Sequence, residues 1–349
     1  MREIALDGLV VNDNNAPYII AEVGHNHSGS IEKCKQLFFA AKNAGCNSVK
    51  LQKRHNDTLY TKTFAHKPYN SFHSYGNTYL EHRKALEFSI YQYADLQAYC
   101  KGIGITFFAT AFDIHSAREL RDIDIPIYKV ASADLLNFPL LCELIQYEKP
   151  LIISTGGHDY EDIDQCHMYL HSRGFKNFAF LHCVATYPNE DYEVNLMAIG
   201  KMRDLWKHHV IGWSDHYSGI LSAISAYHYG ARIIEKHFTL RRTDKGTDHA
   251  QSLEPKKMAD LVNDLRICTK MRGDGEKRVY EKEKEPIRKM AKSLWPARTI
   301  YKGETFTPEN IALKTPADGL SPCHYEEIIG KAAIHELSTA DPLKWEDIG

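Results

Sequence analysis

The chain has 349 residues, of which 43% are hydrophobic and 25% are charged, and its formal net charge is −2. This composition is typical of a globular protein, and the near-neutral charge excludes a general attraction to nucleic acid or to an anionic membrane. No apolar run approaches the roughly 20 residues that a membrane-spanning helix needs, and the amino-terminal residues lack a signal-peptide core. The eight cysteines show no metal-finger spacing, which predicts reduced thiols in a cytoplasmic protein.

Eight short apolar runs, β-branched at their centres and followed by polar or charged residues, recur along the chain. They cover residues 18–24, 48–54, 105–112, 127–134, 150–157, 178–187, 209–216 and 231–240. Segments of helical periodicity separate them, and Gly45, Gly174 and Gly230 stand just before the next run, as helix-terminating glycines do. Eight strand–helix alternations predict a (β/α)8 TIM barrel over residues 1–272.

The remaining segments divide into four expected parts. Residues 1–12 should form a short strand or a plug before the barrel. The long polar stretch 55–90, rich in Tyr, His and Asn, predicts a lid or a substrate wall on the catalytic face. Charged residues 273–291 indicate a linker. Residues 292–349 predict a small, mostly β domain that is too small to bury a large core alone and should lean on the barrel or on a second subunit.

Catalytic groups of such barrels lie at the carboxyl ends of the strands. In this chain the ends carry Glu22, Lys50, Gln52, Thr110, Lys129, Ser132, Asp134, Ser154, Tyr187, Ser214, His216 and His237. This set of polar side chains predicts an enzyme.

Two histidines close adjacent predicted strands, His216 in WSDH and His237 in IEKHF. Neighbouring strands lie about 5 Å apart, so both imidazoles can bind one metal ion. Two protein ligands leave positions open for substrate, which suits a Lewis-acid ion. Glu22 would complete the metal's surroundings through water or act as a general acid or base.

Lys50 and Lys129, with hydroxyl side chains around them, predict a cradle for phosphate or carboxylate. A second interpretation of the lysines is Schiff-base chemistry, as in pyruvate aldolases, with Lys129 or Lys236 as the nucleophile. Asp248, in the loop that follows the eighth strand, is a candidate for binding sugar hydroxyls.

The motifs resemble those of the sialic acid synthases, over nearly the whole chain and in the family's order. They are AEVGHNHSG (21–29), VKLQK (49–53), YKVASAD (128–134), IISTGG (152–157), WSDH (213–216), IEKHFTL (234–240) and KGTDHAQSLEP (245–255). The segment from Ser293 to Lys314 resembles the antifreeze-like (SAF) domain that closes those enzymes.

The resemblance implies condensation of phosphoenolpyruvate with an N-acetylmannosamine-type aldose to a nonulosonic acid, with release of phosphate. It implies Mn or Mg held by His216 and His237, and Glu22 as the acid/base group. It implies phosphoenolpyruvate binding by Lys50, Thr110, Lys129, Ser132, Ser154 and Ser214, and acceptor sugar binding by Gln52, Asp134, Tyr187 and Asp248. It also implies a homodimer in which the SAF domain of one subunit caps the barrel of the other.

Three positions depart from the family pattern. Lys314-Thr315-Pro316 stands where many members have an Arg-Pro pair, and Ala185 replaces an asparagine that contacts phosphate. Arg241 replaces an acidic residue, so we expect a more anionic acceptor, phosphorylated or acidic. A non-enzymatic interpretation would take the antifreeze-like segment as an ice-binding or carbohydrate-binding module.

Overall fold

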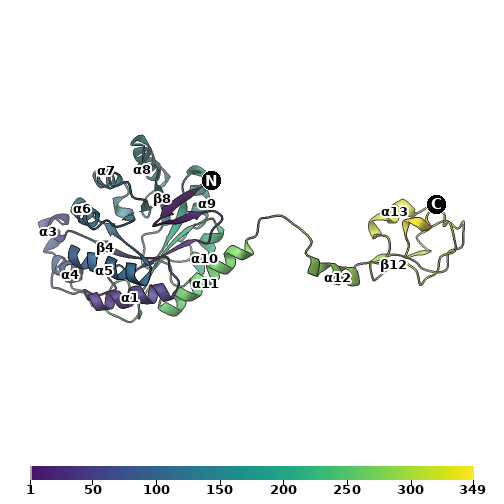
Figure 1. Cartoon of the computed structure of the whole chain (residues 1–349), viewed down its shortest axis with the longest axis horizontal. Helices are drawn as coiled ribbons and strands as arrows, with labels where there is room; N and C mark the ends of the chain where they lie inside the picture. The colour runs from purple at the N-terminus through teal and green to yellow at the C-terminus, as the bar shows by residue number, and fades with distance from the viewer. Residues whose placement is uncertain (1) are drawn as a thin grey trace. The chain divides into compact units, whose positions relative to one another are not determined.

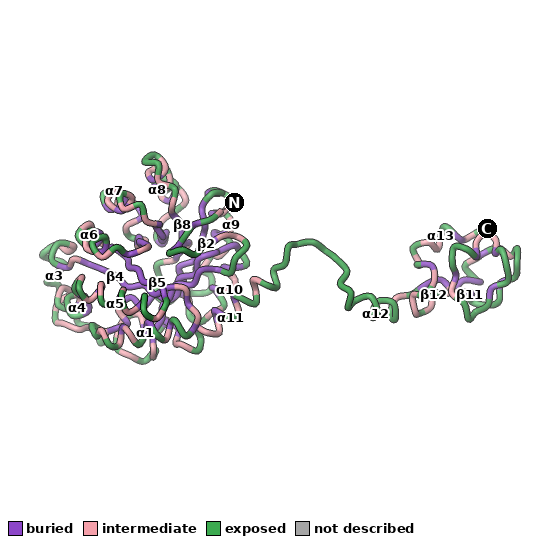
Figure 2. The backbone as a smooth tube through the Cα atoms, in the orientation of Figure 1, coloured by how far each residue is buried: buried purple, intermediate pink, exposed green. Residues whose placement is uncertain are grey.

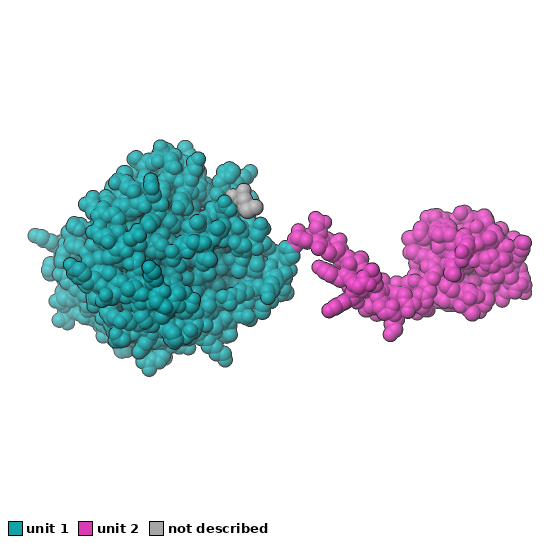
Figure 3. All heavy atoms as spheres, viewed as in Figure 1, with its two compact units in different colours: residues 1–273 teal, residues 274–349 magenta. Residues whose placement is uncertain are grey.

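The computed structural model describes residues 2–349 and divides into two compact units, residues 1–273 and 274–349 (Figure 3). Each unit has a hydrophobic core of its own. Within the described residues no helix combines the length and the apolar character needed to cross a bilayer.

All eight predicted runs form strands, and the strands close into one parallel barrel (Figure 1). They are β3 (Tyr18–Glu22), β4 (Ser48–Lys53), β5 (Thr106–Ala111), β6 (Tyr128–Val130), β7 (Leu151–Ser154), β8 (Phe178–Cys183), β9 (Ile211–Asp215) and β10 (Ile233–His237). Strand β10 pairs with β3 and completes the ring, His237 lying opposite Glu22. The predicted TIM barrel is therefore confirmed.

The helices that follow the strands surround the barrel. They are α1 (Ile31–Asn43), α5 (Ile90–Ile103), α6 (Ile114–Asp122), α7 (Phe138–Ile145), α8 (Tyr160–Ser172), α9 (Met197–Leu205), α10 (Leu221–His228) and α11 (Pro255–Met271). The predicted helix stops are confirmed at Gly45, Gly174 and Gly230, whose φ angles are 89°, 74° and 104°, a region that costs a glycine little.

Alternation along the strands separates the chemistry of the two barrel faces. In β4, Val49 and Leu51 face outward into the core beneath the helices, whereas Lys50 and Gln52 face the barrel interior. Figure 2 shows the strands as buried segments and the outer helix faces as exposed ones. One strand therefore stabilises the fold with one set of side chains and supplies the site with the other.

A hairpin of β1 (Glu3–Leu6) and β2 (Leu9–Asn12) plugs one end of the barrel. Its Ile4, Leu6 and Val11 join an apolar cluster of inward-facing residues that includes Ile20 and Phe108. The hairpin bears out the expected plug for residues 2–12, and Met1 lies outside the described residues.

The long segment after β4 contains three short helices, α2 (Asn56–Leu59), α3 (Lys62–Ala65) and α4 (Tyr79–Leu86). It packs against the loop after β10, because the Tyr75 hydroxyl donates to the carbonyl of Lys245 at 2.6 Å and Gly246 N–H donates to His73 Nδ1 at 3.2 Å. The two loops thus build one side of the barrel mouth.

The second unit begins with a charged segment that contains an unpredicted helix, α12 (Glu281–Met290), exposed along its whole length. Strands β11 (Ser293–Pro296) and β12 (Ile311–Lys314) form an antiparallel pair, and α13 (Tyr325–Ile328) follows. Residues 329–337 form only isolated bridges. Leu294, Phe306 and Leu343 belong to the small core of this unit.

Candidate functional site

A deep pocket opens at the carboxyl ends of the barrel strands, with a cavity volume of about 80 Å³. Eleven of the side chains predicted from the sequence line it together: Glu22, Lys50, Gln52, Thr110, Lys129, Ser132, Ser154, Tyr187, Ser214, His216 and His237. They come from all eight strands or from the residues just after them, and the closed sheet is what brings them together.

Lys50 lies at the centre of a buried polar network. Its Nζ is 2.5 Å from the carboxylate of Glu22 on the neighbouring strand and donates to Thr110 Oγ1 at 2.9 Å. Gln52 Nε2 donates to the other oxygen of Glu22 at 2.7 Å. These bonds fix both the carboxylate and the ammonium group with little exposure, so each is oriented before a ligand enters.

Lys129 is the second buried cation of the pocket. Its Nζ donates to Ser154 Oγ at 2.6 Å and to the carbonyl of Val130 at 3.0 Å. Burial lowers the pKa of Lys129, and Glu235 counteracts that shift. Burial would raise the pKa of Glu235, but Lys129 and Lys50 hold it below its ordinary value.

The pocket contains two ammonium groups and two carboxylates, so the formal charges of Lys50, Lys129, Glu22 and Glu235 cancel. A ligand with both a phosphate and a carboxylate would need further positive charge in a site of this composition. The pocket's own charged groups therefore do not offset the charge of such a ligand.

His216 and His237 face each other with ring centroids 5.4 Å apart. His216 Nδ1 donates to the carbonyl of Val184 at 2.8 Å, which leaves Nε2 with its lone pair. Burial lowers the pKa of His216 to about 3, so the ring is neutral at neutral pH. Among the described residues, the buried Nδ1 of His237 has no hydrogen-bond partner. The two rings thus fit the nitrogen ligands of a metal ion.

A wider chamber of about 320 Å³ adjoins the deep pocket and shares Gln52, Tyr187 and His237 with it. The ring of Tyr187 packs against that of His216, tilted by 32° and with ring centroids 3.9 Å apart. Asp248 lines this chamber, and its carboxylate lies 3.8 Å from His237 Nδ1. The predicted sugar-binding residues Gln52, Tyr187 and Asp248 therefore surround one space beside the two histidines.

Two arginines line the same chamber, Arg54 just after β4 and Arg83 in α4. His25 lies between them, with Nε2 3.3 Å from Arg54 and Nδ1 3.5 Å from Arg83. Burial and the two guanidinium groups hold the pKa of His25 well below its ordinary value. Within residues 2–349, neither guanidinium forms an ion pair with a carboxylate. The chamber therefore holds two guanidinium groups without a paired carboxylate, beside the single carboxylate of Asp248.

Three sequence-based expectations do not coincide with this arrangement. Asp134 lies in the turn after β6, where it accepts from Asn137 at 2.9 Å, and it lines neither cavity. The side chain of Arg241 is 76% exposed and paired with Asp244 at 3.1 Å, away from both cavities. Lys236 faces outward from β10 toward Asp215, so it cannot be the Schiff-base nucleophile of the mouth.

Glu235, Arg54 and Arg83 were missed by the sequence analysis. Glu235 could have been found, because it stands two residues before His237 and strand side chains at i and i+2 share a face. Arg54 could have been found in the same way, because it ends the predicted run 48–54 and stands two residues after Gln52, with which it lines the chamber. Arg83 lies in the insertion, and no local pattern brings it to the mouth.

Comparison with known proteins gives two family matches along the chain. Residues 37–277 match the model of the NeuB family, and residues 291–349 match the SAF domain. An N-acetylneuraminate-9-phosphate synthase of Drosophila melanogaster is 33% identical over 93% of this chain and 94% of its own length. An N,N'-diacetyllegionaminic acid synthase of Campylobacter jejuni is 35% identical over 90% of this chain and 95% of its own length.

A solved structure agrees with these matches. The N-acetylneuraminic acid synthetase of Leptospira borgpetersenii, crystallised in complex with citrate, superposes with a TM-score of 0.73 at 30% identity. It covers 82% of this chain and 95% of its own length.

Proposed function

The chain belongs to the NeuB family, and from this membership we propose that it condenses phosphoenolpyruvate with an N-acetylmannosamine-type aldose to give N-acetylneuraminate or a related nonulosonic acid, releasing phosphate. The names of its relatives support a synthase of this product class. The observation that carries the proposal is the deep pocket of two buried lysines beside two facing histidines, open to a polar chamber. The enzyme would be a transferase that forms a carbon–carbon bond.

Phosphoenolpyruvate would lie in the deep pocket. Lys129 with Ser154, and Lys50 with Thr110, present ammonium and hydroxyl donors from neighbouring strands to its phosphate and carboxylate. Ser132 and Ser214 add hydroxyls to the lining of the pocket. Because these donors are already fixed by hydrogen bonds to one another, they would orient the enol for attack with little reorganisation.

His216 and His237 would hold the divalent ion, Mn or Mg. The ion would offset the charge of the anionic ligand, because the formal charges of the pocket itself cancel. When bound, the ion would supply positive charge and Lewis-acid polarisation of the aldehyde oxygen. The neutral ring of His216, fixed through Nδ1 by the carbonyl of Val184, keeps the ligating nitrogen in place.

The reaction balances with these groups. The methylene carbon of phosphoenolpyruvate forms a bond to the aldehyde carbon of the open-chain sugar. The C=O bond of the aldehyde opens to an alkoxide, C2 becomes cationic, and the alkoxide takes up the proton that the attacking water releases through Glu22. Water adds to the cationic C2 and gives its proton to the carboxylate of Glu22, which Lys50 and Gln52 orient. The tetrahedral intermediate then collapses by cleavage of the C–O bond, which leaves the ketone of the product and free phosphate.

The acceptor sugar would lie in the outer chamber, where Gln52, Tyr187 and Asp248 can bind its hydroxyls. Arg54 and Arg83 favour an acceptor with an anionic group at the end remote from the aldehyde, such as a 6-phosphate. This assignment keeps the expected anionic acceptor but moves its recognition from Arg241 to the two arginines of the chamber. The relatives include a synthase named for a 9-phosphate product.

We also propose a homodimer in which the SAF domain of one subunit caps the partner's barrel mouth. The support is the family match over residues 291–349 and the small size of that domain's core. Light scattering would give the mass in solution. Activity recovered on mixing a barrel variant, His237→Ala, with a chain truncated after residue 273 would demonstrate capping in trans.

The deciding experiment measures phosphate release from phosphoenolpyruvate with N-acetylmannosamine, its 6-phosphate, mannose and a 2,4-diacetamido sugar. Each acceptor is tested with Mn, with a chelator and with His237→Ala. Release that requires an acceptor and a metal, and that the substitution abolishes, would support the proposal. Metal-independent release, or none with any acceptor, would contradict it.

The alternative is a Schiff-base aldolase, and only Lys129 of the two lysines considered for it faces the pocket. Its lowered pKa is the observation in favour. Borohydride trapping with pyruvate, abolished by Lys129→Met, would establish this chemistry and displace the synthase assignment.

A further inference from the structure

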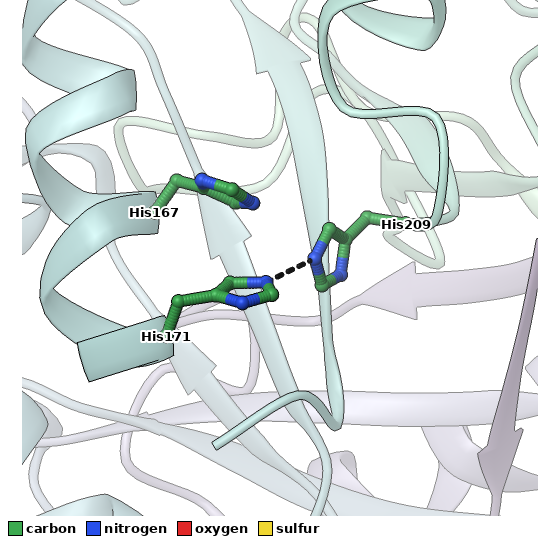
Figure 4. Close-up of side chains that lie close together, drawn as sticks. All are labelled: His167, His171 and His209. Atoms are coloured by element: carbon green, nitrogen blue, oxygen red, sulfur yellow. Dashed lines mark hydrogen bonds between the residues drawn. The ribbon is translucent and has the colours of Figure 1, made fainter. Parts of the chain in front are cut away.

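We propose that His167, His171 and His209 form a second metal site, specific for a transition metal such as Zn²⁺, on the side of the barrel opposite its mouth. The proposal is independent of the catalytic assignment. His167 and His171 stand one turn apart on α8, and His209 lies two residues before β9 (Figure 4). Each ring offers one nitrogen, and the three nitrogens all lie within 4.8 Å of one another.

Two of the nitrogens already stand at the separation that a shared metal requires. His171 Nε2 and His209 Nε2 are 3.1 Å apart, the contact drawn as a dashed line in Figure 4. Two ligands of a tetrahedral zinc ion with bonds of about 2.0–2.1 Å are separated by about 3.3 Å. Binding would replace one N–H···N hydrogen bond between these rings with two metal bonds.

The buried ring is oriented as metal-ligating histidines are. His209 Nδ1 donates to the carbonyl of Phe178 at 3.2 Å, so its Nε2 carries the lone pair and faces the other two rings. The ring is also stacked on Phe178 with centroids 4.0 Å apart. His209 is 4% exposed, and both contacts hold it in place before any ion binds.

The third ring is free to complete the site. Within residues 2–349, neither nitrogen of His167 makes a hydrogen bond, and its buried Nδ1 lies 3.9 Å from the carboxylate of Asp164. The side chain of His167 is 19% exposed, which gives an ion a path from solvent. Three imidazoles and one open position favour zinc, cobalt, nickel or copper over Mg or Mn.

The position indicates a structural role rather than a catalytic one. Phe178 begins β8 and His209 precedes β9, so the cluster lies at the amino ends of the strands, where barrel residues serve stability. An ion held there would tie α8 to the segment that enters β9.

The test is a Co²⁺ titration of the full chain in the His216→Ala/His237→Ala background, which removes the histidines of the mouth. One equivalent with the visible absorption of a low-coordinate Co²⁺ site, displaced by Zn²⁺, is expected. His167→Ala and His171→Gln should each weaken binding at least tenfold, whereas His208→Ala, an exposed neighbour, should not. A rise of several degrees in melting temperature with Zn²⁺, absent in His167→Ala, should accompany binding.

No binding in this background, or binding that His167→Ala leaves unchanged, would overturn the site. If the double variant does not fold, the stoichiometry of the unsubstituted protein decides, because His167→Ala should remove one equivalent of Zn²⁺. An unchanged stoichiometry would mean that the cluster is packing alone.

Discussion

Lys236 and Asp215 form an ion pair of 3.0 Å on the outer face of neighbouring barrel strands, and neither side chain is exposed to solvent. The Ser222 hydroxyl of α10 donates to the same carboxylate at 2.6 Å. The pair therefore joins β9, β10 and α10 behind the site, while Glu235 and His237 on either side of Lys236 face the pocket.

Lys236→Met should lower the free energy of unfolding by about 3–5 kcal/mol, because it leaves the carboxylate of Asp215 buried without its counter-charge. The double variant Asp215→Asn/Lys236→Met should recover part of this loss, because no uncompensated charge remains. Urea unfolding of the barrel measures both. Equal or greater destabilisation in the double variant would contradict the ion-pair interpretation.

Arg83→Gln should raise the KM for a phosphorylated acceptor at least tenfold and leave that for the neutral sugar nearly unchanged. A hydrogen bond to a charged group contributes about 1.5–3 kcal/mol, and every 1.4 kcal/mol is a factor of ten. Arg241→Gln is the matched control, because that side chain is exposed and lies outside both cavities. An equal rise in KM for both acceptors, or the same effect from Arg241→Gln, would contradict recognition of the anion by Arg83.

Acid should destabilise the barrel through His27, whose ring is stacked on Phe88 and accepts from Gly29 N–H at 3.1 Å. Burial lowers the pKa of His27 from 6.5 to about 3. The stabilising contribution is complete above pH 6.5 and decreases as the pH falls toward 3, because only the unfolded chain takes up the proton.

Between pH 7.5 and 5.5 this linkage amounts to about 1.4 kcal/mol for one proton. His27→Asn keeps an acceptor for the Gly29 N–H without a titrating group. Between pH 7.5 and 5.5 its free energy of unfolding should therefore fall by about 1.4 kcal/mol less than that of the unsubstituted protein. The exposed His208→Asn should retain the dependence of the unsubstituted protein. Identical pH profiles for all three proteins would exclude His27 as the cause.

Gly212→Ala should destabilise the barrel by about 1–3 kcal/mol or more, through overpacking. A Cβ at this position in β9 would lie 2.4 Å from the carbonyl oxygen of Ile233 and 2.4 Å from Leu181 Cδ2. Gly200→Ala in α9 is the control, since a Cβ there meets nothing within 4 Å and alanine favours the helix by about 0.5–1 kcal/mol. The melting temperature should therefore fall for Gly212→Ala and rise for Gly200→Ala. An unchanged melting temperature for Gly212→Ala would show that the barrel interior can expand at this layer.

Some residues of the site could be predicted from the strand ends in the sequence, and others could not. Lys50, Ser214 and His237 could be assigned to the mouth because a strand end is visible as a change from apolar to polar residues. The same reasoning does not fix the direction of the Asp134 side chain, because the chain turns into a short helix after Val130 and the carboxylate accepts from Asn137. Arg241 likewise follows its strand but turns outward to Asp244.

The sequence by itself determined the eight-stranded barrel, eleven of the side chains that line its mouth and the separate carboxyl-terminal unit. These follow from local periodicity, since apolar spacing and strand termini are properties of short segments. Only the tertiary structure decided which distant side chains converge. Arg54 and Arg83 both contact His25, and His209 contacts His171 of α8. These contacts depend on the closure of the barrel and on packing between segments that are far apart in the sequence.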